Sequence, residues 1–284
     1  MLLNDVNTTN SISEGEMVRY PAVAGQFYPG SPAELKAYLE SFCRRDLPKV
    51  KAKAIMVPHA GYIYSGKVAG ETYSRVVIPS TNVVMGPNHT GLGRPVSVYP
   101  EGVWLTPLGE VPINEEVASE LIERGPYEPD TAAHIYEHSL EVQVPFLQHC
   151  SGYRDDLSIV PVVFQHIPYS ECVRAGEVLA EVLSGREDSL IVVSTDFSHY
   201  VSQEEAQKLD SLAIDAILNL DPEELYRRVH AYNITMCGVI PATVALVAVK
   251  ILGATGAELV MYRTSGDVTG DYRQVVGYAG IIIY

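Results

Sequence analysis

Four of the eight histidines in this 284-residue chain lie just past apolar runs that predict β-strands. In chain order, these pairs are run 54–58 with His59, 82–86 with His89, 157–164 with His166 and 190–196 with His199. Open α/β sheets bind ligands beyond the carboxyl ends of their parallel strands, so we expect these imidazoles to reach one rim. Imidazole binds metals and also exchanges protons near neutral pH. A chemical site at this rim is the first prediction.

His59 and His89 are the strongest candidates for ligands. They lie in "VPHAGYIYSG" and "MGPNHTG", where proline and glycine shape the turn and let the backbone approach a ligand closely. His166 lies in "FQHIPYS", which has no small-residue turn, and is interpreted as an ordinary loop residue.

The segment "STDFSH" brings a carboxylate and an imidazole to the end of one strand. Asp196 could orient His199 and raise its pKa toward use as an acid or base. Equally, Asp196 could simply cap the following turn. Both interpretations remain open at this stage.

Cys237, in "MCGVIPATVAL", precedes a hydrophobic helix whose exposed N–H groups favour a thiolate. The thiolate could be a nucleophile or a soft metal ligand, and a small core cysteine is the plainer interpretation. Two designs can therefore be built. One is a hydrolase using Cys237, His199 and Asp196, and the other is a metal site of His59, His89 and Cys237.

The segment "YEHSLEVQVPFL" contains two further polar residues, His138 and Glu141. With Ser139 as a cap, Glu141 falls in the first turn of a helix, a common pattern with no catalytic meaning. His134 precedes His138 at a spacing that would suit zinc on a helix, but no HExxH motif is present.

Alternating strands and helices predict a single α/β domain with a largely parallel central sheet. Two further strands, 257–265 and 275–284, are expected to form an antiparallel edge. Residues 1–16 are interpreted as a flexible extension and 17–284 as the domain. The expected helices span 31–43, 66–76, 114–124, 139–149, 170–184, 203–219, 222–230 and 237–252.

Composition excludes several classes of protein. A formal net charge of −15 argues against nucleic-acid binding and against an anionic membrane surface. The longest apolar run, "CGVIPATVALVAV", is too short to span a bilayer, and the polar N-terminus is not a signal peptide. Four cysteines without a CxxC pair predict reduced thiols in a cytoplasmic protein. No pattern indicates an oligomeric state.

Taken in order, the motifs resemble the Memo family, named for a human member that mediates receptor-driven cell motility. The resemblance rests on "PAVAGQFYP", "VPHAGYIYSG", "MGPNHTG", "EHSLEVQVPFLQ", "VVSTDFSHY", "MCGVIPATVAL" and "TSGD", and covers about residues 18–284. It implies a fold similar to class III, LigB-type extradiol dioxygenases. It also implies that His59, His89 and Cys237 occupy metal-site positions, with Asp196 and His199 as the neighbouring polar pair.

The dioxygenases bind non-haem Fe(II) through two histidines and a carboxylate, whereas a cysteine replaces the carboxylate here. We therefore expect Fe(II) or copper, with zinc as an alternative, and metal-dependent redox or oxygen chemistry on a small molecule. His199 and Asp196 are the expected catalytic pair, and His138 and Glu141 belong near the pocket. A non-enzymatic scaffold is the second hypothesis, in which Tyr62 and Tyr64 form an aromatic groove for a peptide or partner.

Overall fold

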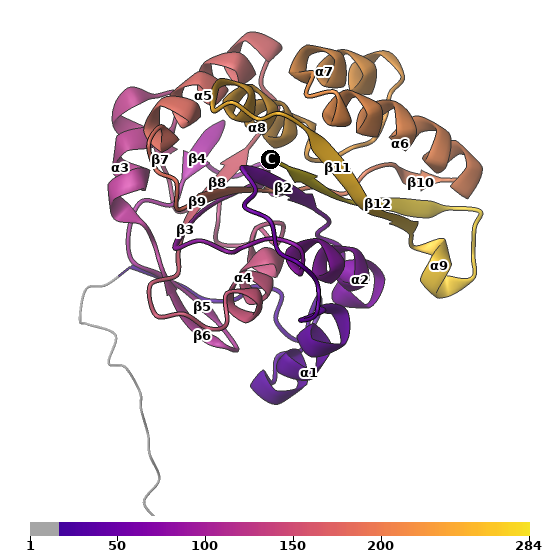
Figure 1. Cartoon of the computed structure of the whole chain (residues 1–284), viewed down its shortest axis with the longest axis horizontal. Coiled ribbons are helices and arrows are strands. Elements are labelled where there is room, and N and C mark those ends of the chain that lie inside the picture. The colour runs from indigo at the N-terminus through magenta and orange to yellow at the C-terminus, as the bar shows by residue number, and fades with distance from the viewer. Residues whose placement is uncertain (1–16) are drawn as a thin grey trace, which may run out of the picture.

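Four buried strands run parallel at the centre of the molecule, and their order places the candidate site (Figure 1). Across the sheet the order is β2, β9, β3, β8, with bounds Ala54–Val57, Ser189–Ser194, Thr81–Pro87 and Ser158–Phe164. Their nearly continuous apolar sequences are buried because helices cover both faces of the sheet. The structure, a computed structural model, describes residues 17–284; the predicted extension 1–16 lies outside the described residues.

The sheet is mixed, which corrects the expectation of a largely parallel one. On one side β12 (Val275–Ile283) is antiparallel to β2, and on the other β4 (Val96–Val98) is antiparallel to β8. The expected antiparallel pairing of β11 (Ala257–Thr264) with β12 is confirmed. Only a short connection separates these two strands, so they cannot make the long crossover that parallel pairing requires.

Several short strands were not expected from the sequence. They are β4, described above, together with β1 Val18–Arg19, β5 Val103–Thr106, β6 Gly109–Pro112, β7 Glu128–Pro129 and β10 His199–Val201. β1, β5 and β6 form a separate three-stranded sheet, whereas β7 and β10 lie at the edges of the main sheet. Segments of two to four residues are too short to show a periodic hydrophobic pattern.

Helices lie on both faces of the sheet, so the fold has three layers (Figure 1). One face carries α1 Pro32–Phe42, α2 Tyr62–Tyr73 and α4 Val144–Cys150. The other carries α3 Glu115–Arg124, α5 Tyr169–Leu183, α6 Gln203–Leu218, α7 Pro222–Ala231 and α8 Val239–Ile251. The short helices are the 3₁₀ turn η1 Glu141–Gln143 and α9 Gly266–Thr269. Within residues 17–284, no helix has both the length and the apolar character needed to cross a bilayer.

Two helices differ from expectation near the site. α2 begins at Tyr62, not at residue 66, and the helix expected over 139–149 is split into η1 and α4. In α2 the glycines are packing residues, because a Cβ on Gly66 would lie only 2.5 Å from the ring of Phe42.

Candidate metal centre

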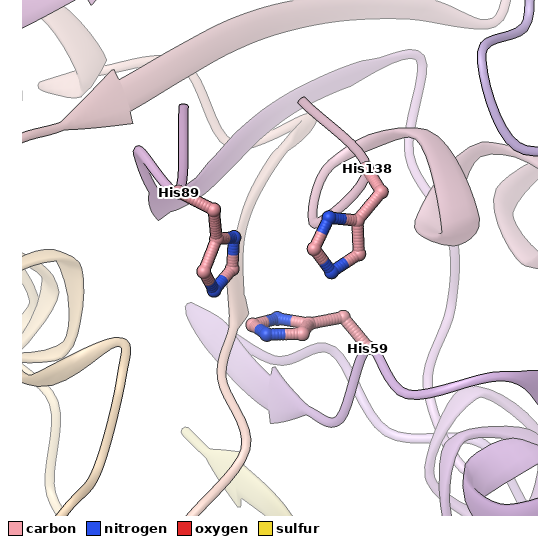
Figure 2. Close-up of side chains that lie close together, drawn as sticks. All are labelled: His59, His89 and His138. Carbon is pink, nitrogen blue, oxygen red and sulfur yellow. The ribbon is translucent and has the colours of Figure 1, made fainter. Parts of the chain in front are cut away.

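Three histidine side chains converge beyond the carboxyl ends of the parallel strands, and Figure 2 shows their rings grouped around one space. One ring nitrogen from each of His59, His89 and His138 lies within 4.8 Å of the other two. The ring of His138 stacks on that of His89 with centroids 4.6 Å apart. The ring of His59 stands edge-on, with its centroid 5.2 Å from that of His89 and 5.5 Å from that of His138.

The strand order explains how His59 and His89 meet. His59 follows β2 and His89 follows β3, and these strands are separated in the sheet only by β9. Asp196 follows β9 and therefore emerges between them. This is the rim arrangement predicted for parallel strands.

His138 reaches the rim by a different route, on the segment between β7 and η1. Ser139 anchors that segment to β3, because its Oγ donates to the carbonyl of Pro87 at 3.1 Å. The close approach depends on Gly86, where a Cβ would lie 2.6 Å from Leu140 and 2.7 Å from Ser139 Oγ. The third histidine is therefore placed by a tertiary contact and does not follow a strand.

The tautomer of His59 is set by Ser194, at the end of β9. The Ser194 hydroxyl donates to the carbonyl of Ser139 at 2.6 Å, so its lone pairs must accept the other contacts. One comes from the Gln143 amide at 2.8 Å, and the other from His59 Nδ1 at 3.1 Å. Nδ1 of His59 therefore carries the proton, and the lone pair of Nε2 is available for a metal.

Burial favours the neutral imidazole at two histidines of the cluster, His59 and His138. Burial lowers the pKa of His59 well below its usual value, and the neighbouring imidazoles of His89, His138 and His199 lower it further. Burial also lowers the pKa of His138. Neutral imidazole is the form that binds metals, so protons do not compete strongly for these nitrogens.

His89 is oriented by Glu137, a fully buried carboxylate. Glu137 Oε1 lies 2.8 Å from His89 Nδ1, and Oε2 accepts the backbone N–H of His89 at 2.6 Å. Burial alone would raise the pKa of Glu137, but the hydrogen bonds from His89 and from the Ser139 N–H outweigh it and lower the pKa to about 2. An ionised carboxylate on Nδ1 leaves Nε2 of His89 as the nitrogen that could bind a metal.

We expect Glu137→Gln to weaken metal binding by roughly 10- to 100-fold, the usual effect of removing such a supporting carboxylate. Competition with a chromophoric chelator measures the affinity. Glu128→Gln is the matched control, because Glu128 is exposed on β7 and, within residues 17–284, forms an ion pair with Arg94 alone. Equal affinities in the two variants would contradict this role for Glu137.

Cys237 lies directly against His59, with Sγ 3.3 Å from Nε2. The Asp196 backbone N–H donates to the same sulfur at 3.3 Å. Cys237 precedes α8 as expected, and the chain passes close to β9 here because Gly238 has no Cβ, which would lie 2.4 Å from Thr195. Burial and then the charge of Asp196 raise the pKa of Cys237, so the thiolate expected from the helix start does not form unaided. The metal-free hydrolase design is therefore disfavoured.

Asp196 and His199 do not form the expected hydrogen-bonded pair. The Asp196 carboxylate accepts the His59 backbone N–H at 2.8 Å, and its other oxygen lies 3.9 Å from His59 Nε2. His199 is oriented instead by Thr235, whose carbonyl accepts from His199 Nδ1 at 2.8 Å. The left-handed backbone of Tyr200 (φ 59°) lies within β10, at the irregularity in the pairing of β10 with β12. Nδ1 of His199 is therefore protonated, and its Nε2 is free.

Glu141 anchors the N-terminal segment and is not a member of the imidazole cluster. Its carboxylate forms a buried ion pair with Arg19 and accepts the backbone N–H groups of Ala22 and Val23 at 2.8 and 3.0 Å. That segment carries Phe27, whose ring centroid lies 4.7 Å from that of His138. Glu141 therefore supports one wall of the site from behind.

The two tyrosines beside His59 have different environments. Tyr62 is buried, and its hydroxyl donates to the carbonyl of Val142 at 2.6 Å. Tyr64 is 39% exposed. Of the pair expected to form an aromatic groove, only Tyr64 could contact a ligand without rearrangement.

Two other histidines lie outside the cluster. His134 is fully buried beside Tyr99 and Trp104, and burial lowers its pKa to about 3. His166 is exposed and packs near His230. Neither belongs to the group that could hold a metal, as expected for both.

The sequence did not reveal the roles of Glu137, Ser194 and Gln143, which orient the nitrogens that could bind a metal. Glu137 carried a usable signal, because it directly precedes His138 in "YEHS". Ser194 and Gln143 carried none, since each looks like an ordinary polar residue at the end of an element.

The fold and the site together define a mixed α/β protein with a three-histidine cluster that could hold a metal ion. The chain belongs to the Memo family: the family model described as "Memo-like protein" matches residues 19–282. The recognition drawn from the ordered motifs is thereby confirmed.

Curated relatives support the same assignment over nearly the whole length. A MEMO1 family protein of Aquifex aeolicus is 51% identical, and the match covers 93% of this chain and 98% of that protein. A MEMO1 family protein of Methanopyrus kandleri is 43% identical, with coverage of 94% and 99%.

Among solved structures, the chain is similar to an uncharacterised protein of Escherichia coli K12, with a TM-score of 0.54 and 14% identity. The match covers 81% of this chain and 99% of that one, and at this identity it supports the fold alone. The expected similarity to LigB-type dioxygenases stays a prediction.

Proposed function

We propose that this Memo-family protein binds one metal ion through His59, His89 and His138, with the thiol of Cys237 as an additional donor, and uses it for redox or oxygen chemistry on a small molecule. The observation that carries this proposal is the convergence of three imidazoles within 4.8 Å, of which His59 is buried, His138 half-buried and His89 exposed. Hydrogen bonds to Ser194 and Glu137 already orient two of them for metal binding.

The donor set narrows the choice of metal. Imidazole nitrogen suits iron, copper and zinc alike, and a thiolate sulfur adds preference for softer metals. Because the resemblance to class III dioxygenases points to electron transfer, we propose Fe(II) or copper before zinc. Such a metal would activate oxygen or exchange electrons with a bound substrate.

His199 and Asp196 are the proposed proton-transfer groups. Thr235 holds the protonated Nδ1 of His199, so the lone pair on Nε2 can accept a proton from a substrate. Burial raises the pKa of Asp196 to about 6, against the opposing hydrogen bond from His59 N–H, so this carboxyl exchanges its proton near neutral pH. Both residues lie next to the proposed metal ligands, at the ends of β9 and β10.

The ligand role of Cys237 is tested spectroscopically. Bound Co(II) should show a sulfur-to-metal charge-transfer band that disappears in Cys237→Ser, while Co(II) still binds through the three imidazoles. Cys172→Ser, which changes a buried cysteine in α5, should retain the band. An identical spectrum for Cys237→Ser and the unmodified protein would contradict thiolate ligation.

Oxygen uptake by the Fe(II)-loaded protein tests the redox part of the proposal, with catechol as the probe. We expect uptake above that of free Fe(II), and none from protein in which His59 is replaced by alanine. Metal binding without any uptake would reject the oxygen chemistry and favour the binding-protein hypothesis.

A further inference from the structure

Cys43 and Cys150 lie together, although 107 positions separate them in the chain. Their sulfur atoms are 3.5 Å apart, and both residues are half-buried, so a small oxidant can reach them. Both are free thiols in the structure. A disulfide needs sulfur atoms about 2.0 Å apart, so a shift of roughly 1.5 Å would suffice to form one.

The two cysteines lie at the ends of two helices, and the segments before these helices reach the proposed metal centre. Cys43 follows the last residue of α1, and Cys150 is the last residue of α4. α1 comes after the segment that carries Phe27, and α4 comes directly after η1, which begins at Glu141. The two helices pack against each other (Figure 1), so a bond between their ends would close a covalent loop around this side of the fold.

One charged group lies near the pair, because Lys49 Nζ donates to the backbone carbonyl of Cys150 at 3.1 Å. The hydrogen bond with Cys150 and burial raise the pKa of Cys43, and the charge of Lys49 opposes this only in part. The closeness of the two sulfurs, rather than a stabilised thiolate, therefore favours a link between them. In contrast, Cys172 is fully buried in α5 and has no cysteine neighbour among the described residues.

We propose that Cys43 and Cys150 are a redox-sensitive pair that forms an intramolecular disulfide on reaction with a disulfide oxidant such as oxidised glutathione. One thiol loses its proton and attacks the oxidant, releasing one reduced glutathione and leaving a mixed disulfide. The second thiolate attacks the protein sulfur of that mixed disulfide, releasing the second glutathione. The two protein thiols give up two electrons and two protons, which the two glutathione molecules retain.

The test compares the full chain after treatment with oxidised glutathione and after reduction. We expect a linked peptide pair containing Cys43 and Cys150, lighter than the separate peptides by two hydrogen atoms. We also expect the oxidised protein to melt roughly 5–10 °C higher, because closing so long a loop restricts the unfolded chain.

Two single variants control the experiment. Cys43→Ser should lose both the linked peptide and the thermal shift, whereas Cys172→Ser should retain both. A thermal shift that persists in Cys43→Ser, glutathione adducts without an internal link, or four unreacted thiols at full oxidation would each overturn the proposal.

Discussion

His59→Ala lowers the affinity of the protein for a divalent metal by more than about 100-fold. Loss of a supporting group alone commonly costs 10- to 100-fold, and this substitution removes a ligand itself. His59 is also the imidazole that faces both other histidines and the thiol of Cys237. Titration of the metal-free protein with Zn(II) against a competing chelator measures the change.

The matched control is His166→Ala. His166 also follows a parallel strand, β8, but it is exposed and lies outside the imidazole cluster. We expect this variant to bind metal as the unmodified protein does. Circular dichroism and urea unfolding of both variants separate a lost ligand from a lost fold. If His59→Ala folds normally and binds Zn(II) with unchanged affinity, the proposed metal centre is wrong.

Glu141→Ala should lower the free energy of unfolding by about 3–5 kcal/mol, because it leaves the buried guanidinium of Arg19 without its counter-charge. The substitution also removes the acceptor for the backbone N–H groups of Ala22 and Val23 and for the Tyr28 hydroxyl. Unpaired buried donors cost additional stability. Urea denaturation followed by circular dichroism gives the value.

Two further variants define the origin of this loss. Glu141→Gln should lose less stability than Glu141→Ala, because its amide oxygen still accepts a hydrogen bond. Asp46→Asn breaks an exposed ion pair with Arg44 and should leave the unfolding midpoint unchanged within error. If Glu141→Ala unfolds at the same urea concentration as the unmodified protein, as Asp46→Asn is expected to, the buried ion pair contributes no net stability.

Much of the fold could be predicted because its central strands carry strong local signals. The runs around Ile55, Val84, Val162 and Val192 are almost wholly apolar, as expected for strands buried on both faces. Strand direction was harder to predict. β4 and β12 run antiparallel to their neighbours because of the connections that lead into them. The hydrophobic pattern of a strand carries no information about those connections, so it does not predict the direction of the strand.

The candidate site was likewise predictable from the sequence only in part. Two histidines of the cluster were predictable, because His59 and His89 each follow a parallel strand and strand ends meet at one rim. Glu141 was expected near the pocket, and its carboxylate binds Arg19 and the N-terminal segment, which carries Phe27 beside His138. The position of Glu141 in the first turn of a helix does not predict which distant basic side chain it pairs with.

The family, the α/β class and the first two imidazoles could be predicted without the structure, because ordered motifs and apolar runs are properties of the chain. The structure was needed to show that His138 joins them and that Glu137 and Ser194 orient the rings. The structure also shows that the Thr235 carbonyl, and not the Asp196 carboxylate, accepts the hydrogen bond from the His199 ring. These contacts join segments far apart in the chain. They exist because Gly86 and Gly238 allow backbones to approach within distances that a side chain would forbid.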